Sequence, residues 1–272
     1  MAWTPFTRAH HDRSGLRYAS DTTEEEWRVI EPFMPPQPSR GRKRQTDLRA
    51  VVDAVFYLLQ SGCQWGLLPK DLPPKSTVHY YFKRFSGDGT WARIHDALYR
   101  ETRDLEGREE SPSYAIIDSQ SVKTGTEARG HVGFGAGKKA KGRKRHILVD
   151  TLGLILKAEV HSAGLQDRDG AALVFEHLIS RFPFIEAICG DGAYQGPTAQ
   201  SASPRPLEIV NRNQTGFTVL PKRWIVERTF AWLGINRRLS KDYERFAPTS
   251  LAFIQTAMIK LMTRRLARYS YS

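Results

Sequence analysis

The sequence predicts an α/β protein in which a small all-α domain precedes a mixed sheet flanked by helices. Apolar residues repeat at helical spacing as far as residue 105, and short apolar runs bounded by turn residues follow from residue 114. Residues 107–113 between them are charged and turn-rich, which is typical of a domain boundary. The expected divisions are an N-terminal arm (1–20), a helical domain (21–108) and an α/β domain (109–272).

Four helices are expected in the helical domain. The first begins with the capping box Thr22-Thr-Glu-Glu25 and ends before Pro35. Thr46 caps the second, which stops at Gly62. The third covers residues 76–85, and Thr90 caps the fourth. Short helices joined by tight turns suggest a helix-turn-helix fold.

The third helix is the expected DNA-reading element. Val78, Phe82 and Phe85 are expected to pack inward, while polar and cationic residues suited to bases and phosphates face outward. The outward residues are Ser76, Thr77, His79, Lys83 and Arg84. The same pattern also fits a solvated face on a structural helix, because helix-turn-helix folds carry no fixed sequence code.

The α/β domain is expected to alternate strands and helices. Its predicted elements are a strand ending at Asp118, a hairpin of residues 146–150 and 154–160, a helix opened by Asp167, a strand ending at Asp191, strand material at 207–210 and 217–220, a helix bearing Glu227, and an amphipathic helix over 250–268.

Three carboxylates occupy specific places in these elements. Asp118 and Asp191 each close an apolar strand, and Glu227 lies on a helix. Burying one ionised carboxylate without a partner is costly, and grouping three is tolerable mainly if divalent cations neutralise them. A metal site is therefore the first hypothesis. Each acid alone also fits a structural role, bonded to loop amides or, for Glu227, paired with Arg223 one turn away.

Three further carboxylates are assigned structural roles. Asp150 suits the turn of the hairpin, and helix N-capping explains Asp167 and Asp169. The two cysteines, Cys63 and Cys189, lie far apart among apolar neighbours and form neither a zinc pattern nor a disulfide framework.

The composition narrows the class of partner. The 272 residues carry a net charge of +12, which favours a polyanion such as nucleic acid. Hydrophobic residues make up 40% of the chain, enough for a sizeable core in two domains. Neither a signal peptide nor a membrane span is indicated, so a cytoplasmic protein is expected.

The predicted order of strand, hairpin, helix, strand and acid-bearing helix resembles the ribonuclease H-like core. Five segments are similar to the signatures of bacterial insertion-sequence DDE transposases of the group of insertion sequences four and five. These segments are Ile116-Ile-Asp-Ser-Gln-Ser-Val-Lys123, Gly137-Lys-Lys-Ala-Lys-Gly-Arg-Lys-Arg-His146, Leu165-Gln-Asp-Arg-Asp-Gly170, Gly190-Asp-Gly-Ala-Tyr194 and Trp224-Ile-Val-Glu-Arg-Thr-Phe-Ala-Trp-Leu233. The resemblance covers nearly the whole chain, and residues 65–78 resemble the group's helical N-terminal domain.

The resemblance implies a catalytic triad of Asp118, Asp191 and Glu227 that holds two divalent metal ions. Mg²⁺ fits all-oxygen ligation with open water positions, and Mn²⁺ is the alternative. The implied substrates are the terminal inverted repeats of an insertion sequence and target DNA, with strand cleavage followed by strand transfer. The protein is then expected to act at the bacterial nucleoid, as a homodimer when two ends are synapsed.

The helix around Glu227 adds a predicted phosphate-binding row. At helical spacing, Arg223, Glu227, Arg238 and Lys241 fall on one stripe, with the small Gly234 between them. The family motif expects a tyrosine and an arginine before the third acid and a lysine after it. Arg223 matches the arginine, whereas Leu220 and Gly234 stand at the tyrosine and lysine positions. Trp224 and Trp232 fit either base stacking or, more commonly, a core.

A basic run lies between Asp118 and the predicted hairpin, where it is expected to track the DNA backbone. Its members are Lys138, Lys139, Lys141, Arg143, Lys144 and Arg145. Two other functions remain open from the sequence. One is a catalytically decayed DNA-binding regulator of the same element, and the other is a host nuclease of the ribonuclease H type.

Overall fold

The computed structural model describes residues 11–135, 139–210 and 222–269. They form two compact units. The helical unit contains the described residues up to Leu105 and those from Gln255 onward, and the sheet unit contains those from Glu106 to Ile254. The sequence-based division placed the whole C-terminal segment with the α/β domain, so residues from Gln255 onward group differently from that expectation.

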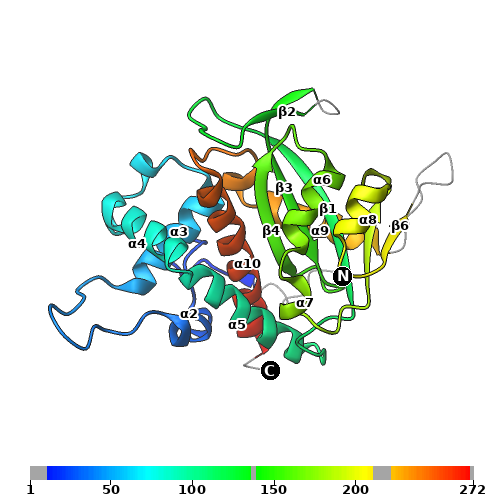
Figure 1. Cartoon of the computed structure of the whole chain (residues 1–272). Coiled ribbons are helices and arrows are strands. Elements are labelled where there is room, and N and C mark those ends of the chain that lie inside the picture. Colours follow the sequence, from blue (N-terminus) through cyan, green and yellow to red (C-terminus); the bar gives the residue numbers. More distant parts are fainter. Residues whose placement is uncertain (1–10, 136–138, 211–221, 270–272) are drawn as a thin grey trace. The chain divides into compact units, whose positions relative to one another are not determined.

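The helical unit is built from short helices (Figure 1). They are α2 (Glu24–Ile30), the 3₁₀ turn η1 (Glu31–Phe33), α3 (Leu48–Ser61), the 3₁₀ turn η2 (Trp65–Leu67), α4 (Lys75–Gly87), α5 (Thr90–Leu105) and the part of α10 (Ala247–Tyr269) that begins at Gln255. The four predicted helices are therefore present.

Two of the predicted caps are shifted by one residue. The capping box of α2 joins Thr23 and Glu26 rather than Thr22 and Glu25. Thr22 instead donates its amide and its hydroxyl to the buried carboxylate of Asp53. Asp47, rather than Thr46, caps α3, and the helix ends as predicted at Gly62, whose φ of 68° suits glycine.

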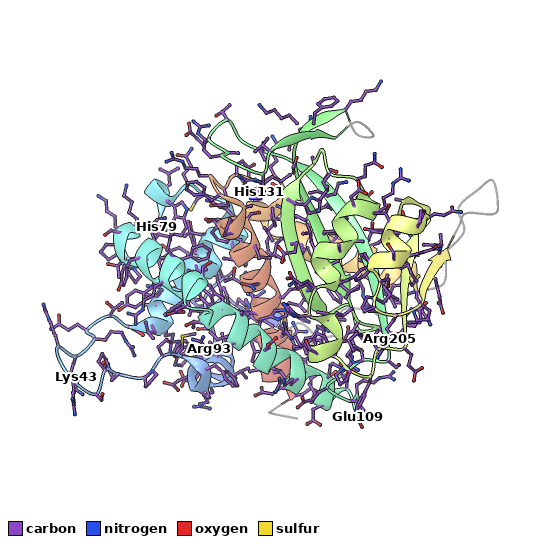
Figure 2. All side chains as sticks on the ribbon, in the orientation of Figure 1. Lys43, His79, Arg93, Glu109, His131 and Arg205 are labelled. Atoms are coloured by element: carbon purple, nitrogen blue, oxygen red, sulfur yellow. The ribbon has the colours of Figure 1, made fainter. Side chains whose placement is uncertain are left out.

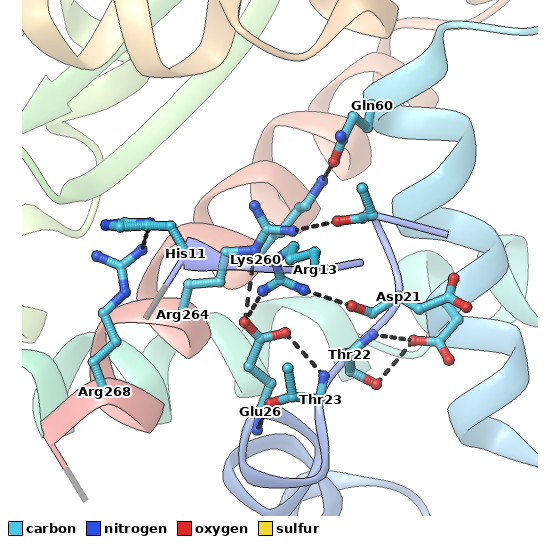
Figure 3. A network of polar contacts seen from close by, with 12 residues as sticks. His11, Arg13, Asp21, Thr22, Thr23, Glu26, Gln60, Lys260, Arg264 and Arg268 are labelled. Carbon is cyan, nitrogen blue, oxygen red and sulfur yellow. Dashed lines mark hydrogen bonds and ion pairs between the residues drawn. The ribbon is translucent and has the colours of Figure 1, made fainter. Parts of the chain in front are cut away.

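A polar network ties the N-terminal segment of the helical unit to α10 (Figure 3). The carboxylate of Glu26 pairs with Arg13 and lies 3.7 Å from the Arg264 guanidinium. Arg264 also donates to the Ala19 carbonyl, and Lys260 donates to the Gln60 side chain. These contacts explain why the end of the chain belongs to the helical unit.

The sheet unit contains a six-stranded mixed sheet. Its strands are β1 (Tyr114–Lys123), β2 (Gly133–Gly135), β3 (Ala140–Val149), β4 (Ile155–Ser162), β5 (Ala187–Asp191) and β6 (Leu207–Val210). β1 pairs antiparallel with β3 and parallel with β5, which pairs parallel with β6. β2 and β4 pair with successive parts of β3, so the predicted hairpin is confirmed.

Helices cover both faces of this sheet (Figure 1). They are α6 (Asp167–Phe175), α7 (Leu178–Arg181), α8 (Pro197–Ala202), α9 (Arg223–Gly234) and the 3₁₀ turns η3 (Gly192–Tyr194) and η4 (Arg237–Leu239). α6 packs on β3 and β4, whereas α9 packs on β1, β3 and β5. Because side chains alternate along a strand, neighbouring residues of β1 face these two helical layers in turn.

Two predicted element limits are wrong. β1 does not end at Asp118 but continues to Lys123, because β3 pairs with it along that whole stretch. α9 ends at Gly234, so Arg238 and Lys241 do not continue its stripe. The predicted strand segment 217–220, including Leu220, lies outside the described residues. No helix in the part of the chain that the structure describes is long and apolar enough to cross a membrane.

Candidate active site

Asp118 and Asp191 lie on neighbouring strands of the sheet. The parallel register of β1 and β5, extended by two residues, places them beside each other. The Asp118 carboxylate accepts a hydrogen bond from the Ser119 amide at 2.7 Å. The Asp191 carboxylate accepts one from the Ala193 amide at 3.0 Å and so caps η3.

The surroundings of Asp118 resist its negative charge. Burial is the largest cause that raises the pKa of Asp118 to about 7, and the carboxylates of Asp191 and Asp167 raise it further. The Ser119 amide and the Arg223 guanidinium act in the opposite direction. A cation placed beside Asp118 would therefore favour its ionised form.

Glu227 lies on α9, the helix that packs on β1 and β5. Its side chain is 62% exposed and lies one helical turn after Arg223, whose Nε is 3.8 Å from the Glu227 carboxylate. The same guanidinium contacts the Asp191 carboxylate at 3.0 Å. Arg223 therefore links the second and third predicted acids, and its partners here are carboxylates.

The chemistry of these three side chains suits a hard divalent cation. They offer only carboxylate oxygens, the donor type that Mg²⁺ prefers. Burial and the neighbouring carboxylates raise the pKa of Asp118, so a bound cation would stabilise its ionised form. Among the described residues, no three carboxylate, imidazole or thiol side chains already surround a single ion position. The acids fit the ions that the resemblance implies by donor type and charge.

A fourth carboxylate, that of Asp167, supports β1 from the other face. It accepts a hydrogen bond from the Ser119 hydroxyl and another from Lys144, with which it pairs at 2.8 Å. Against the opposing effect of burial, these hydrogen bonds lower the pKa of Asp167. The predicted N-cap role is wrong for Asp167 and Asp169, because both lie within the first turn of α6 and no side chain caps that helix. The predicted turn role of Asp150 is confirmed, because its carboxylate accepts hydrogen bonds from the backbone amides of Leu152 and Leu154.

Half of the predicted basic run is buried in β3, contrary to expectation. Arg143 is fully buried, pairs with Asp242 at 3.1 Å and donates to nearby carbonyls. Arg145 donates to the carbonyls of Leu239 and Lys241, and Lys144 is held by Asp167. These three cations are therefore unsuited to tracking DNA in this structure.

The remaining predicted cations differ in exposure. Lys139 and Lys141 are exposed, and Lys138 lies outside the described residues. Lys241 is exposed, whereas Arg238 is buried and pairs with Glu244 at 2.7 Å. The expectation that Arg238 grips phosphate beside Glu227 is thus corrected, because its guanidinium has a protein partner within the loop after α9.

α4 presents the predicted division between buried and exposed faces. Val78, Phe82 and Phe85 are at most 1% exposed. Of the five outward residues, Thr77 is half-buried, and Ser76, His79, Lys83 and Arg84 are exposed. Figure 2 shows His79 on this helix. The exposed side chains are available to a partner, and their proposed contacts with DNA stay a prediction.

Trp224, for which a core position was favoured, is 47% exposed on α9. Arg228 lies over its ring at 4.6 Å and over the Trp232 ring at 4.7 Å. Gly234 ends the helix with open space where a Cβ would project. The family's lysine position is therefore a helix end without a side chain.

Sequence reasoning missed a buried group behind Asp191. Tyr194, His146 and His161 are at most 5% exposed and are joined by hydrogen bonds. The segment Gly190-Asp-Gly-Ala-Tyr194 contained the signal for Tyr194. The two histidines share no local motif, because strand pairing brings them together.

Family comparisons agree with this arrangement. The family model of the transposase DDE domain matches residues 109–262, more than half of the chain. The chain is a DDE transposase. A family model of IS4/5 transposases, DUF4096, matches residues 22–95 of the same transposase. This second match agrees with an insertion-sequence transposase of the IS4/5 type. The mixed sheet is consistent with the ribonuclease H-like fold of DDE transposases.

A relative of the transposase occurs in an insertion element. The 16.2 kDa protein of insertion element IS402 from Burkholderia cepacia is 28% identical over 106 residues, which cover 37% of this chain and 71% of the relative. No solved structure gives a significant match. Enzymes of this family generally use divalent metal ions.

Proposed function

We propose that this transposase binds the terminal inverted repeats of its own insertion sequence, cleaves DNA there and joins the ends to target DNA. Asp118, Asp191 and Glu227 are the proposed ligands of two Mg²⁺ ions, with Mn²⁺ as a substitute. The main support is the placement of Asp118 beside Asp191 together with the raised pKa of Asp118. Two divalent ions, when bound, polarise the phosphodiester and activate the attacking oxygen.

Each acid contributes differently in this proposal. Asp118 lies on the central strand, and a bound cation would favour its ionised form at neutral pH. The turn of η3 holds Asp191 through the Ala193 amide. Glu227 is exposed on α9 and is free to adjust its rotamer toward the other two acids. Arg223 contacts both Glu227 and Asp191, and contact with a DNA phosphate would draw its guanidinium away from them.

DNA recognition is assigned to two sets of residues. On α4, Ser76, Thr77 and His79 are the proposed base contacts, and Lys83 and Arg84 the phosphate contacts. In the sheet unit, Lys139, Lys141 and Lys241 are proposed to contact the DNA backbone. The net charge of +12 supports a polyanionic partner. Synapsis of the two transposon ends would require at least a homodimer. We place its action at the nucleoid in the cytoplasm.

A catalytically decayed regulator is the alternative, favoured by the missing side chain at Gly234. The test uses duplex DNA carrying the inverted repeats that flank the gene. Asp118→Asn, Asp191→Asn and Glu227→Gln should each abolish Mg²⁺-dependent nicking and strand transfer while leaving end binding nearly unchanged, because these side chains are assigned to metal ligation and not to DNA contacts.

Two exposed carboxylates supply matched controls for this test. Asp169→Asn and Glu186→Gln remove charge without touching the three acids and should retain full activity. Normal strand transfer by any triad variant would contradict the role of that position. A wild-type chain that binds the ends but never nicks them would favour the regulator.

A further inference from the structure

A hydrogen-bonded chain of three side chains crosses the interior of the sheet unit behind Asp191. The Tyr194 hydroxyl lies 2.8 Å from His146 Nε2. His146 Nδ1 lies 3.2 Å from His161 Nε2, and His161 Nδ1 lies 3.0 Å from the Ser162 carbonyl. The chain thus connects η3, β3 and β4.

The last contact determines the direction of every hydrogen bond in the chain. A carbonyl oxygen only accepts, so His161 Nδ1 must carry hydrogen. In a neutral ring, His161 Nε2 then accepts, which requires a hydrogen on His146 Nδ1. His146 Nε2 is left as the acceptor for the Tyr194 hydroxyl. Both imidazoles are therefore in the Nδ1–H form, and Tyr194 is the donor at the other end.

The surroundings favour this neutral state. Burial is the main cause that lowers the pKa of His146 to about 3, and burial also lowers the pKa of His161. Burial likewise raises the pKa of Tyr194 well above its ordinary value. All three groups are consequently uncharged at neutral pH, as the single direction of the chain requires.

Two glycines show how tightly this chain is packed. A Cβ at Gly170 of α6 would lie 2.7 Å from His146 Nδ1 and 2.9 Å from His161 Nε2, so the helix backbone closes directly over the bond between the histidines. A Cβ at Gly190 would lie 2.9 Å from the Tyr194 ring. Gly190 immediately precedes Asp191, so the anchored tyrosine ring rests against the backbone that carries the second acid.

We infer that Tyr194, His146 and His161 are positioning residues that fix the η3 turn and thereby hold Asp191 in place for metal binding. The inference rests on the proposed role of Asp191 as a metal ligand. The tyrosine ring supplies the packing, and its hydroxyl supplies the orientation through the histidines. Loss of the Tyr194 hydroxyl alone should therefore weaken the binding of metal ions, whereas the packing of the aromatic ring is kept.

The first test measures the tautomers directly in the full-length, metal-free chain. Two-dimensional NMR of ¹⁵N-histidine-labelled protein should show both His146 and His161 neutral and protonated at Nδ1, assigned with His146→Gln and His161→Gln. The exposed His177 serves as an internal reference. An Nε2–H tautomer or a charged ring at either His146 or His161 at neutral pH would contradict the proposed series of hydrogen bonds.

The second test compares two tyrosine variants in Mg²⁺-dependent end cleavage. Tyr194→Phe should raise the Mg²⁺ concentration for half-maximal rate by about tenfold, with end binding unchanged. Tyr114→Phe is the matched control, because Tyr114 donates to Glu208 and takes no part in the chain. An unchanged Mg²⁺ requirement in Tyr194→Phe would refute the positioning role.

These two measurements separate the failure of this inference from failure of the proposed function. If the wild-type chain does not cleave its ends, the proposed function fails, while the tautomers still test the hydrogen-bonded chain. If Tyr194→Phe does not fold, as judged by circular dichroism, His161→Gln replaces it in the Mg²⁺ titration, because it breaks the same series of hydrogen bonds one residue further from Asp191.

Discussion

Individual cations in the basic run have different roles although they adjoin in the sequence. Arg143, Lys144 and Arg145 are buried in β3, whereas Lys141 at its start is exposed. The sequence alone could not separate them, because a run of six cations is usually solvated and strand pairing with β1 and β4 decides which ones are covered. Burial of Arg143 depends on Asp242, which is distant in the sequence.

This difference predicts separate effects on stability and DNA binding. Arg143→Gln leaves the buried Asp242 carboxylate without its partner and should lower the free energy of unfolding by about 3–5 kcal/mol. Lys141→Gln should leave stability unchanged and reduce the salt slope of DNA binding by about one. Urea unfolding and salt-dependent binding assays measure the two effects. An Arg143→Gln chain of normal stability but weak DNA affinity would contradict the structural role.

The placement of Asp118, Asp191 and Glu227 could be predicted from the sequence only in part. The sequence identified Asp118 and Asp191 on strands, and the structure places them beside each other. It could not predict that Arg223 would lie between Asp191 and Glu227, because that contact depends on where α9 begins relative to the sheet edge. Their joint role as metal ligands stays a prediction.

At the scale of elements, hydrophobic periodicity predicted which helices and strands exist better than it predicted the residues at which they begin and end. The helices of the helical unit, the β3–β4 hairpin and β5 are all present near their expected positions. β1 extends past Asp118 through polar residues because β3 supplies its hydrogen bonds, which a local pattern does not reveal. α9 ends at Gly234, so the stripe predicted at helical spacing wrongly included Arg238 and Lys241, which lie beyond the helix.

The exposed face of α4 gives the element-scale prediction. Lys83→Ala combined with Arg84→Ala should weaken binding to repeat and random DNA alike and reduce the salt slope by about two, because both residues are assigned to phosphates. His79→Ala should instead reduce the preference for the repeat by about 1–3 kcal/mol.

Fluorescence anisotropy with repeat and random duplexes distinguishes these outcomes. Arg28→Ala, which removes an exposed cation from α2, is the control and should change neither property. If the α4 variants behaved like Arg28→Ala, this helix would have no role in DNA recognition.

At the scale of the whole molecule, the end of the chain belongs to the helical unit. Residues from Gln255 onward group with it and supply Lys260 and Arg264 to its polar network (Figure 3). The sequence could not show this, because a single amphipathic helix does not identify the surface that covers it. A fragment ending at residue 108 would therefore lack part of the unit's core and is unsuited to testing DNA recognition.

The burial of Lys260 leads to a specific prediction of how stability depends on pH. Burial is the main cause that lowers the pKa of Lys260 to about 7, with Arg264 and Arg13 adding to the effect. The unfolded chain therefore binds the proton more tightly, so stability should be lowest below pH 7 and rise toward about pH 10. Lys260→Met should raise the free energy of unfolding at pH 7 by on the order of 1–3 kcal/mol, and this gain should shrink as pH rises.

Thermal unfolding at pH 6, 8 and 10 follows this gain. Lys70→Met, made at an exposed lysine, controls for the added methionine. A gain that is constant across the three pH values, or a loss of stability at pH 7, would show that Lys260 is not strained by its burial.

The central claim is that folding gathers Asp118, Asp191 and Glu227 around divalent ions. The most direct measurement is Mn²⁺ binding, followed by electron paramagnetic resonance, to the full chain with end DNA present. The wild-type chain should bind two ions, as should the chain carrying Asp169→Asn and Glu186→Gln. The triple variant Asp118→Asn/Asp191→Asn/Glu227→Gln should bind neither ion at these sites. Equal stoichiometry and affinity in the triple variant would contradict the claim.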